Sequence, residues 1–142
     1  MGGSGQAGKA GQDLRGLIRD YMLVPGLSGH EDRIRARIAD DLARIGLAHR
    51  TDRLGNLSVT IEGDPAAPAV LVFTHMDQLG FFVRKIEADG LIRVERMGGV
   101  SERAMAAQVV TLCGSKGDVA GIIQNKAHHA TGAEEKYKVL TA

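Results

Sequence analysis

The apolar run from Ala69 to Phe73, which leads directly into Thr74-His75-Met76-Asp77, constrains the fold of this chain more than any other stretch. A continuous apolar run without alternation is typical of a strand that is covered on both faces, as in the parallel sheet of an α/β protein. Ligand and metal sites in such sheets lie at the carboxyl ends of the strands. The run therefore predicts a central, buried strand that carries polar side chains to the functional edge of the sheet.

His75 and Asp77 are the candidate site residues at that edge. Because side chains alternate along an extended segment, a spacing of two places both on the same side. Imidazole is a good ligand for zinc or cobalt, and a nearby carboxylate can accept its other ring N–H and fix the tautomer. The pair therefore predicts a metal ligand, His75, and a residue that orients it, Asp77. A hydrogen-bonded loop pair without a metal is the alternative, since one ligand does not define a site that needs three or four.

The composition argues against two classes of partner. The chain has 142 residues, which suits one domain, and its net charge of +1 provides no basic field for nucleic acid or a membrane surface. Only 4% of the residues are aromatic and Trp is absent, which argues against base stacking. No apolar run is long enough to span a membrane. We therefore expect neither a nucleic acid nor a membrane as a partner.

Cys113 is the only cysteine of the chain, so no intramolecular disulfide can form. This cysteine usage fits a reducing compartment, and we expect a cytoplasmic location. Cys113 ends an apolar stretch that begins at Val109, so a small buried hydrophobe is expected there and not a nucleophile.

Residues 1–12 are glycine-rich and lack the apolar core of a secretory signal. Gln6 occupies the position at which a myristoylation motif needs Ser or Thr. We expect a flexible tail.

Two amphipathic helices are predicted before the apolar run. The first begins at Asp13 and ends at Pro25-Gly26. The second begins with Ser28-Gly29-His30-Glu31, which reads as a capping box in which Ser28 and Glu31 bond each other's backbone amides, and it ends at Gly46. His30 is expected to be an exposed helix-end residue. One apolar face of each helix is expected to be buried, formed by Leu14, Leu17, Ile18, Tyr21 and Met22 in the first helix and by Ile34, Ile38, Leu42 and Ile45 in the second.

Short strands are predicted on both sides of Asp77. Asp52–Asn56 reads as a turn between two strands, the second of which alternates from Leu57 to Ile61. After Asp77, no helical pattern is visible and Asp89-Gly90 is a hairpin signal. These features predict an all-β module that follows an α/β opening, with a boundary near Gly80. Its strand-like runs are 81–86, 91–96, 108–113 and 119–123.

Several motifs follow one another in a consistent order across residues 13–142. They are Pro25-Gly26-Leu27-Ser28-Gly29-His30-Glu31, Asp52-Arg53-Leu54-Gly55-Asn56-Leu57, Thr74-His75-Met76-Asp77-Gln78-Leu79-Gly80-Phe81, Asp89-Gly90, Gly98-Gly99 and Asn125-Lys126-Ala127-His128-His129. Together they resemble the first part of the tetrahedral (glutamyl) aminopeptidases, a family of cocatalytic metallopeptidases. The last motif departs from the Ser-Lys-Pro-Pro-His segment of that family.

The resemblance implies an α/β fold that is incomplete in this chain. At least some of the strands and helices that would cover the run at Val70–Phe73 would be absent, so we expect this run to be uncovered and to favour self-association. Residues 13–79 would be the start of a mixed-sheet metallopeptidase domain, after the flexible tail at 1–12. Residues 80–142 would be an inserted, truncated all-β module, PDZ-like or barrel-like, that serves oligomerisation or gating.

The resemblance also implies the chemistry. His75 would bind one metal of a two-metal site, most simply zinc or cobalt, and Asp77 would be the catalytic-site residue that orients it. The other metal ligands and the glutamate that acts as general base in the family would lie beyond Ala142. This 142-residue chain alone is therefore expected to be inactive.

Two functional hypotheses follow, with a third beside them. The chain is the amino-terminal portion of an aminopeptidase that hydrolyses amino-terminal residues from short peptides and forms a homo-oligomer when full length. Alternatively, it is a non-catalytic, β-rich assembly or interaction module left by truncation. In the third hypothesis, His128-His129 and His75 form a separate metal site.

Overall fold

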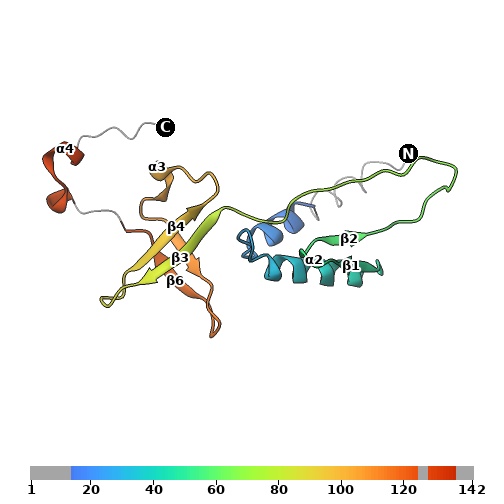
Figure 1. The fold of residues 1–142 in the computed structure, drawn as a ribbon, viewed down its shortest axis with the longest axis horizontal. Helices are drawn as coiled ribbons and strands as arrows, with labels where there is room; N and C mark the ends of the chain where they lie inside the picture. Colours follow the sequence, from blue (N-terminus) through green and yellow to red (C-terminus); the bar gives the residue numbers. More distant parts are fainter. Residues whose placement is uncertain (1–13, 125–127, 137–142) are drawn as a thin grey trace, which may run out of the picture. The chain divides into compact units, whose positions relative to one another are not determined.

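The computed structural model describes residues 14–124 and 128–136, and the chain divides into two compact units between Gln78 and Leu79 (Figure 1). The first unit contains a helix over residues 14–22, α2 (Asp32–Arg44), β1 (His49–Thr51) and β2 (Leu57–Val59). The second unit contains β3 (Gly80–Ile86), β4 (Ile92–Met97), α3 (Glu102–Met105), β5 (Val109–Leu112), β6 (Val119–Ile122), the 3-10 helix η1 (His128–Ala130) and α4 (Ala133–Lys136). The predicted tail at 1–12 and the predicted helix start at Asp13 lie outside the described residues.

Both predicted helices are present in the first unit. The helix over residues 14–22 ends ahead of Pro25, which cannot continue a helix. At the other end of α2, Gly46 has a φ of 77° and its N–H donates to the Ala43 carbonyl at 3.0 Å, while the Leu47 N–H donates to the Leu42 carbonyl at 2.9 Å. These two bonds form a Schellman motif, so the predicted cap at Gly46 is confirmed.

The predicted capping box at the start of α2 is wrong. Glu31 is the N-cap residue and no side chain makes a cap hydrogen bond there. The Glu31 carboxylate accepts the Gly29 N–H at 2.6 Å, and the Ser28 hydroxyl donates to the Asp77 carboxylate. A hydrogen bond to an ionised carboxylate is stronger than one between neutral groups, which explains why Ser28 takes the distant partner.

A polar cluster joins the helix over residues 14–22 to α2. The Tyr21 hydroxyl and Arg37 Nε both donate to Asp41 Oδ2, at 2.9 Å and 3.0 Å. Arg44 forms an ion pair with Asp41 Oδ1 at 2.6 Å. The Arg37 guanidinium lies 5.7 Å from the centre of the Tyr21 ring, within the range of cation–π attraction. The hydrogen bond from Tyr21, followed by that from Arg37, holds the pKa of Asp41 below its usual range.

Ile34 of α2 is the one hydrophobic side chain that is fully buried within the described part of the chain, with 3% of its surface exposed. The backbone of Gly26 lies directly against it. A Cβ atom at position 26 would come within 2.7 Å of Ile34 Cγ2 and 3.5 Å of the Met76 carbonyl oxygen. The fully buried side chain of the first unit therefore packs against the loop that precedes α2.

The predicted burial of the first helix is wrong. Its apolar residues are exposed because no described element of the first unit covers them, whereas Tyr21 is half-buried through its contact with α2. In α2 the prediction holds for part of the face, since Ile38 and Leu42 are half-buried but Ile45 is 71% exposed. The exposed residues of the first helix are Leu14, Leu17, Ile18 and Met22.

The predicted turn at Asp52–Asn56 is confirmed and connects β1 to β2, which pair as antiparallel strands. Asp52 Oδ1 accepts the N–H groups of Leu54 and Asn56, each at 2.9 Å. Gly55 has a φ of 87°, and its carbonyl accepts Arg35 Nη1 at 3.4 Å. The strand after the turn ends at Val59 and not at Ile61, because β1 offers only three residues for pairing.

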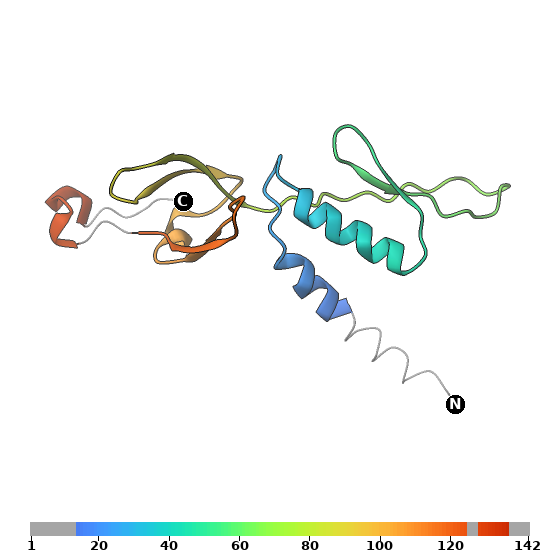
Figure 2. The same ribbon diagram turned by 90° about the horizontal axis from the view of Figure 1, so that it is seen from below.

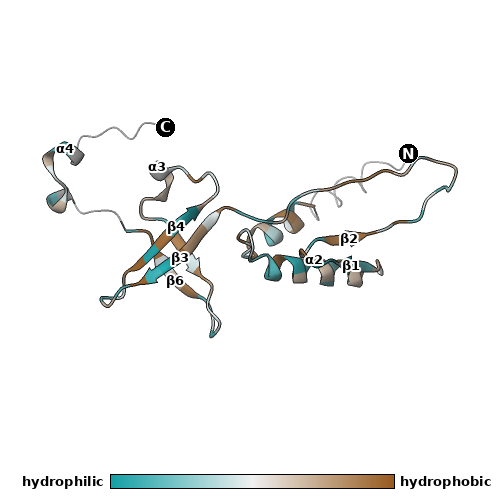
Figure 3. Ribbon diagram, viewed as in Figure 1, coloured by the Kyte–Doolittle hydropathy of each residue, from teal (hydrophilic) through white to brown (hydrophobic). Residues whose placement is uncertain are grey.

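The predicted strand at Ala69–Phe73 does not form, and the run is uncovered, as expected for a chain that lacks the later elements of the family. Residues 69–77 are not part of any strand, and Val70, Leu71, Val72 and Phe73 are 85–88% exposed. Figures 2 and 3 show this stretch as a long, unpaired trace, coloured as strongly hydrophobic in Figure 3. Since a strand needs a hydrogen-bonded neighbour, and the described residues offer this run none, it cannot form the predicted sheet.

The second unit contains all four strands expected after Asp77. β3 pairs with β4 and β5 pairs with β6, both antiparallel, in two separate two-stranded sheets. The predicted hairpin at Asp89-Gly90 is confirmed, with Gly90 at a φ of 89° and the Asp89 carboxylate accepting the Leu91 N–H at 3.0 Å. The PDZ-like or barrel-like assignment of this unit stays a prediction.

Two expectations about the second unit are wrong. It is not purely β, because α3 lies between β4 and β5, and η1 and α4 follow β6. Cys113 is exposed and not buried, since β5 ends at Leu112 and Cys113 lies just beyond the paired residues. Across the whole described portion, no helix has the length and apolar character needed to cross a membrane.

Replacing Gly26 with Ala tests the packing around Ile34. We expect Gly26→Ala to lower the free energy of unfolding by about 1–3 kcal/mol, because the new methyl group overpacks a contact between a backbone and a stiff β-branched side chain. Gly63→Ala is the matched control, since a Cβ there meets nothing within 4 Å, and it should be neutral or stabilising by about 0.4–1 kcal/mol. Urea unfolding followed by circular dichroism measures both, and equal midpoints for the two variants would contradict the packing described above.

Replacing Asp41 with Asn tests the polar cluster between the two helices. The folded-state pKa of Asp41 is lowered, so its contribution to stability is present above the unfolded-state pKa of about 3.9 and is lost as the pH falls through the lower folded-state value. Asp41→Asn should therefore be less stable than the parent at pH 7, with the difference closing toward pH 2. Thermal melts across this pH range measure it. Asp40→Asn, at an exposed neighbouring position of α2, is the control, and a pH-independent deficit for Asp41→Asn would contradict the prediction.

The exposed run at Val70–Phe73 predicts self-association of the 142-residue chain. Unpaired backbone and contiguous apolar surface both favour association. We expect concentration-dependent oligomers by size-exclusion chromatography with light scattering, and binding of a hydrophobic dye. Leu71→Lys with Phe73→Lys should weaken both, whereas Leu54→Lys, in a turn and 89% exposed, should not. A dye-free monomer with a sharp thermal melt would contradict this.

Candidate functional site

The candidate site lies where residues 75–78 meet the loop that precedes α2. Gln78 fixes this contact: its N–H donates to the Gly26 carbonyl at 2.7 Å, and it pairs with Leu27 as neighbours do in a parallel sheet. Its side-chain Nε2 donates to the carbonyls of Tyr21 at 3.3 Å and Val24 at 3.2 Å. The residues just before Gln78 are thereby held at a fixed register against the loop.

His75 and Asp77 are hydrogen-bonded to each other. His75 Nδ1 lies 2.8 Å from Asp77 Oδ1 and 3.1 Å from the Asp77 backbone oxygen. Both atoms are acceptors when the carboxylate is ionised, so Nδ1 must carry the proton in this arrangement. Neutral His75 then has its lone pair on Nε2, as a metal ligand requires.

Asp77 receives a second hydrogen bond from Ser28, through Oδ2. The bond from Ser28, followed by that from His75, holds the pKa of Asp77 below its usual range. Asp77 is therefore an anion at neutral pH and a pure hydrogen-bond acceptor.

The donor set fits part of a metal site. The His75 side chain is 81% exposed, so an ion can reach it, while the Asp77 side chain is 38% exposed. Within the described ranges, no group of three or more His, Cys, Asp or Glu side chains is placed to hold a metal ion. The described residues thus offer one imidazole ligand with an oriented tautomer, and a complete coordination sphere would need further ligands.

His30 and Glu31 do not join this pair. His30 is exposed, as predicted, and its N–H donates to the Leu27 carbonyl at 2.7 Å. The Glu31 carboxylate is bonded to the Gly29 N–H. His128-His129 belong to η1, in the other unit, and the hypothesis that they form a metal site with His75 stays a prediction.

Sequence reasoning missed the roles of Ser28 and Gln78. Ser28 lies in a recognised motif, but its spacing to Glu31 suggested a helix cap and hid its contact with Asp77, 49 residues away. Gln78 carried no local signal, because its role depends on carbonyls at Tyr21, Val24 and Gly26. The one available signal was its position directly after the His-x-Asp motif, where a side chain with two N–H donors can anchor the segment to nearby carbonyls.

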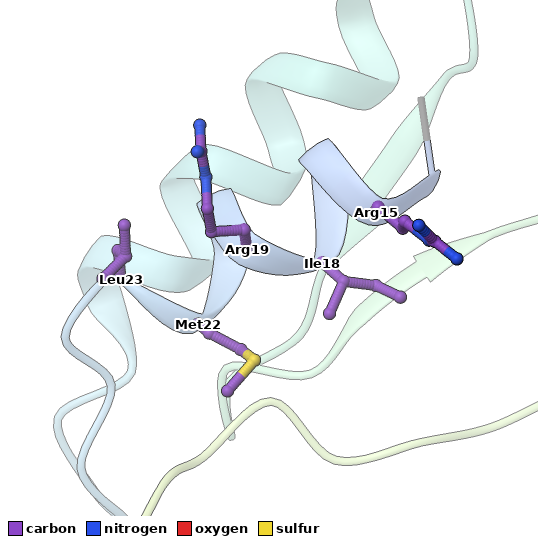
Figure 4. A pocket seen from close by; sticks show the side chains of 5 residues that line it. All are labelled: Arg15, Ile18, Arg19, Met22 and Leu23. Carbon is purple, nitrogen blue, oxygen red and sulfur yellow. The ribbon is translucent and has the colours of Figure 1, made fainter. Parts of the chain in front are cut away.

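A shallow hollow lies along the helix over residues 14–22 (Figure 4). It is lined by side chains from this helix and the turn after it, and by none of the residues that form the His75–Asp77 pair. Its lining is apolar with two flanking cations, so it has no acid, base or nucleophile and is not a candidate active site. The lining residues are Arg15, Ile18, Arg19, Met22 and Leu23.

Comparison with known proteins adds relatives in sequence and structure. SgcX of Escherichia coli (strain K12) is 40% identical over 111 residues, which is 78% of this chain and 30% of that protein. The lysyl aminopeptidase of Pyrococcus furiosus is 34% identical over 108 residues, 75% of this chain and 31% of that enzyme. The crystal structure of a TET aminopeptidase from the marine sediment archaeon Thaumarchaeota archaeon SCGC AB-539-E09 matches with a TM-score of 0.80 at 26% identity, over 93% of this chain and 36% of that one.

The chain thus spans about a third of the length of the relatives it matches. What it matches is an amino-terminal portion of such a peptidase, with an α/β fold that is partial, and the hypothesis of a separate non-catalytic module is not supported. The model of the M42 glutamyl aminopeptidase family matches residues 55–141, which is more than half of the chain and includes His75, Asp77 and the strands of the second unit. The chain therefore belongs to the M42 glutamyl aminopeptidase family.

Proposed function

We propose that this chain is part of a two-metal aminopeptidase that removes amino-terminal residues from short peptides, in which His75 binds one metal ion and Asp77 orients His75. The observation that carries the proposal is the 2.8 Å hydrogen bond between His75 Nδ1 and Asp77 Oδ1, in a segment that matches the family. The named activity of relatives such as the lysyl aminopeptidase of Pyrococcus furiosus supports the reaction class.

The metals, zinc or cobalt by preference, would activate a water molecule and polarise the scissile carbonyl when bound. The residues of this chain would bind and orient: His75 as a ligand, and Asp77 as the residue that positions it. His75 offers the Nε2 lone pair, since its Nδ1 proton stays on the hydrogen bond to Asp77. His75 would not act as a base, because a bound metal ion would occupy that lone pair. Asp77 raises the basicity of the imidazole and prevents the ring from turning, so the ligand is oriented before an ion arrives.

We also propose that the complete protein is a homo-oligomer. The TET1 peptidase of Pyrococcus horikoshii, which can assemble into a tetrahedron or a large octahedral shell, is 30% identical to this chain with a TM-score of 0.67, over 75% of this chain and 32% of that one. In this proposal residues 13–79 begin the peptidase domain, and residues 80–142 begin an inserted β-rich module for assembly or gating. A cytoplasmic location rests on cysteine usage and stays a prediction.

Replacing His75 tests the proposed metal ligand. In the protein expressed from the complete reading frame, His75→Ala should remove metal from one of the two positions and abolish hydrolysis of amino-acid p-nitroanilides. Asp77→Asn should weaken metal affinity on the order of 10–100-fold, because it acts through the ligand and not on the ion. Calorimetric titration with zinc, together with metal analysis of the purified protein, measures both.

Two matched controls separate these effects from general damage. His49→Ala, at an exposed position of β1, and Asp64→Asn, in the loop after β2, lie outside the proposed site and should leave stoichiometry and activity unchanged. A His75→Ala protein that binds zinc with the parental stoichiometry and affinity would refute the assignment of His75.

A further inference from the structure

We propose that Ser28 is a positioning residue for His75: its hydroxyl holds one oxygen of Asp77, so that the other oxygen keeps the Nδ1 proton of His75 and leaves Nε2 for a metal. This inference rests on the proposed function, because the orientation of His75 matters only if His75 binds a metal. The relay of hydrogen bonds from Ser28 through Asp77 to His75 can be tested without a metal.

The first step of the argument is the geometry of the Asp77 carboxylate. Oδ2 accepts the Ser28 hydroxyl, while Oδ1 accepts His75 Nδ1 at 2.8 Å. A carboxylate with one partner can rotate about its terminal bond, whose rotamer distribution is broad. With a donor on each oxygen, rotation would break both hydrogen bonds, so the plane of the carboxylate is fixed.

The second step is that Ser28 is placed by its neighbours and not by its own bond to Asp77. Gly26 accepts the Gln78 N–H at 2.7 Å, and Leu27 pairs with Gln78. After Ser28 the chain turns, with Gly29 at a φ of 79° and its N–H bonded to Glu31 at 2.6 Å. These contacts set Ser28 opposite Asp77 in register.

The third step is exposure. The Asp77 side chain is 38% exposed and that of His75 is 81% exposed, so water competes for both. A single exposed hydrogen bond is worth little against such competition. The Asp77 backbone oxygen, at 3.1 Å from Nδ1, supports the same tautomer but cannot fix the carboxylate. Ser28 is the described group that does so from a separate segment.

The test measures the tautomer of neutral His75 by nitrogen-15 NMR of the imidazole, in the 142-residue chain at a pH above the range in which histidine titrates. In the parent, we expect the Nδ1–H form to predominate. Ser28→Ala should shift the population toward the Nε2–H form, and Ser28→Thr, which keeps a hydroxyl, should restore the parental tautomer. Ser58→Ala is the matched control, since the Ser58 hydroxyl donates to the Arg50 carbonyl, away from Asp77, and it should change nothing.

A double variant separates the relay from a purely structural effect on the loop. If Ser28 acts through Asp77, Ser28→Ala should have no further effect on the tautomer in an Asp77→Asn background. A parent with the mixed tautomers of a free imidazole, an unchanged tautomer in Ser28→Ala, or an equal shift in the Asp77→Asn background would each overturn the proposal.

Zinc binding by the complete gene product distinguishes this inference from the proposed function. Ser28→Ala should weaken zinc affinity measurably. The effect should be smaller than that of Asp77→Asn, for which about 10–100-fold is expected. Should the tautomer respond as expected while His75→Ala retains full zinc binding, the relay stands and the assignment of His75 as a metal ligand fails. Zinc affinity unchanged in Ser28→Ala but reduced in Asp77→Asn would overturn the role of Ser28 in metal binding.

Discussion

In the first unit, the backbone of Gly26 lies against the Ile34 side chain and close to the Met76 carbonyl, and its own carbonyl accepts the Gln78 N–H. The approach of Ser28 to Asp77 follows from this contact. The contact joins the loop before α2 to the segment after the apolar run, and so places Ser28 opposite Asp77. Only glycine allows so close an approach, because any Cβ atom would meet Ile34 at 2.7 Å. The packing of Ile34 and the position of Ser28 therefore both depend on the backbone of Gly26.

The elements that could be predicted from the sequence are those fixed by local chemistry. Gly46 ends α2 because a left-handed residue is needed there, and Asp52 builds its turn from amides two and four residues ahead. The hairpin at Asp89-Gly90 is similarly local. The bond between His75 and Asp77 was predictable for the same reason, since two residues of one extended segment can meet without help from the rest of the fold.

The remaining features depend on distant residues and could not be predicted in this way. Ser28 satisfied a local capping pattern, yet a charged acceptor 49 residues away takes its hydroxyl. The apolar run at Val70–Phe73 predicted a buried strand, but burial needs partners, and the described residues supply none. The chain spans about a third of the length of its relatives. Strands or helices that cover the corresponding run in a relative could therefore come from residues that have no counterpart in this sequence.

Amide hydrogen exchange at Gln78 tests the central claim most directly, namely that the loop before α2 holds the segment carrying His75 and Asp77. The Gln78 N–H donates to Gly26 at 2.7 Å, so it should be protected to an extent similar to the amides within α2. At protein concentrations at which the chain is monomeric, the amides of Val70–Phe73, in the exposed, unpaired run, provide an internal reference for rapid exchange. Protection of Gln78 at the level of α2 is the predicted result. Exchange of Gln78 as fast as that of Val70–Phe73 would contradict the account.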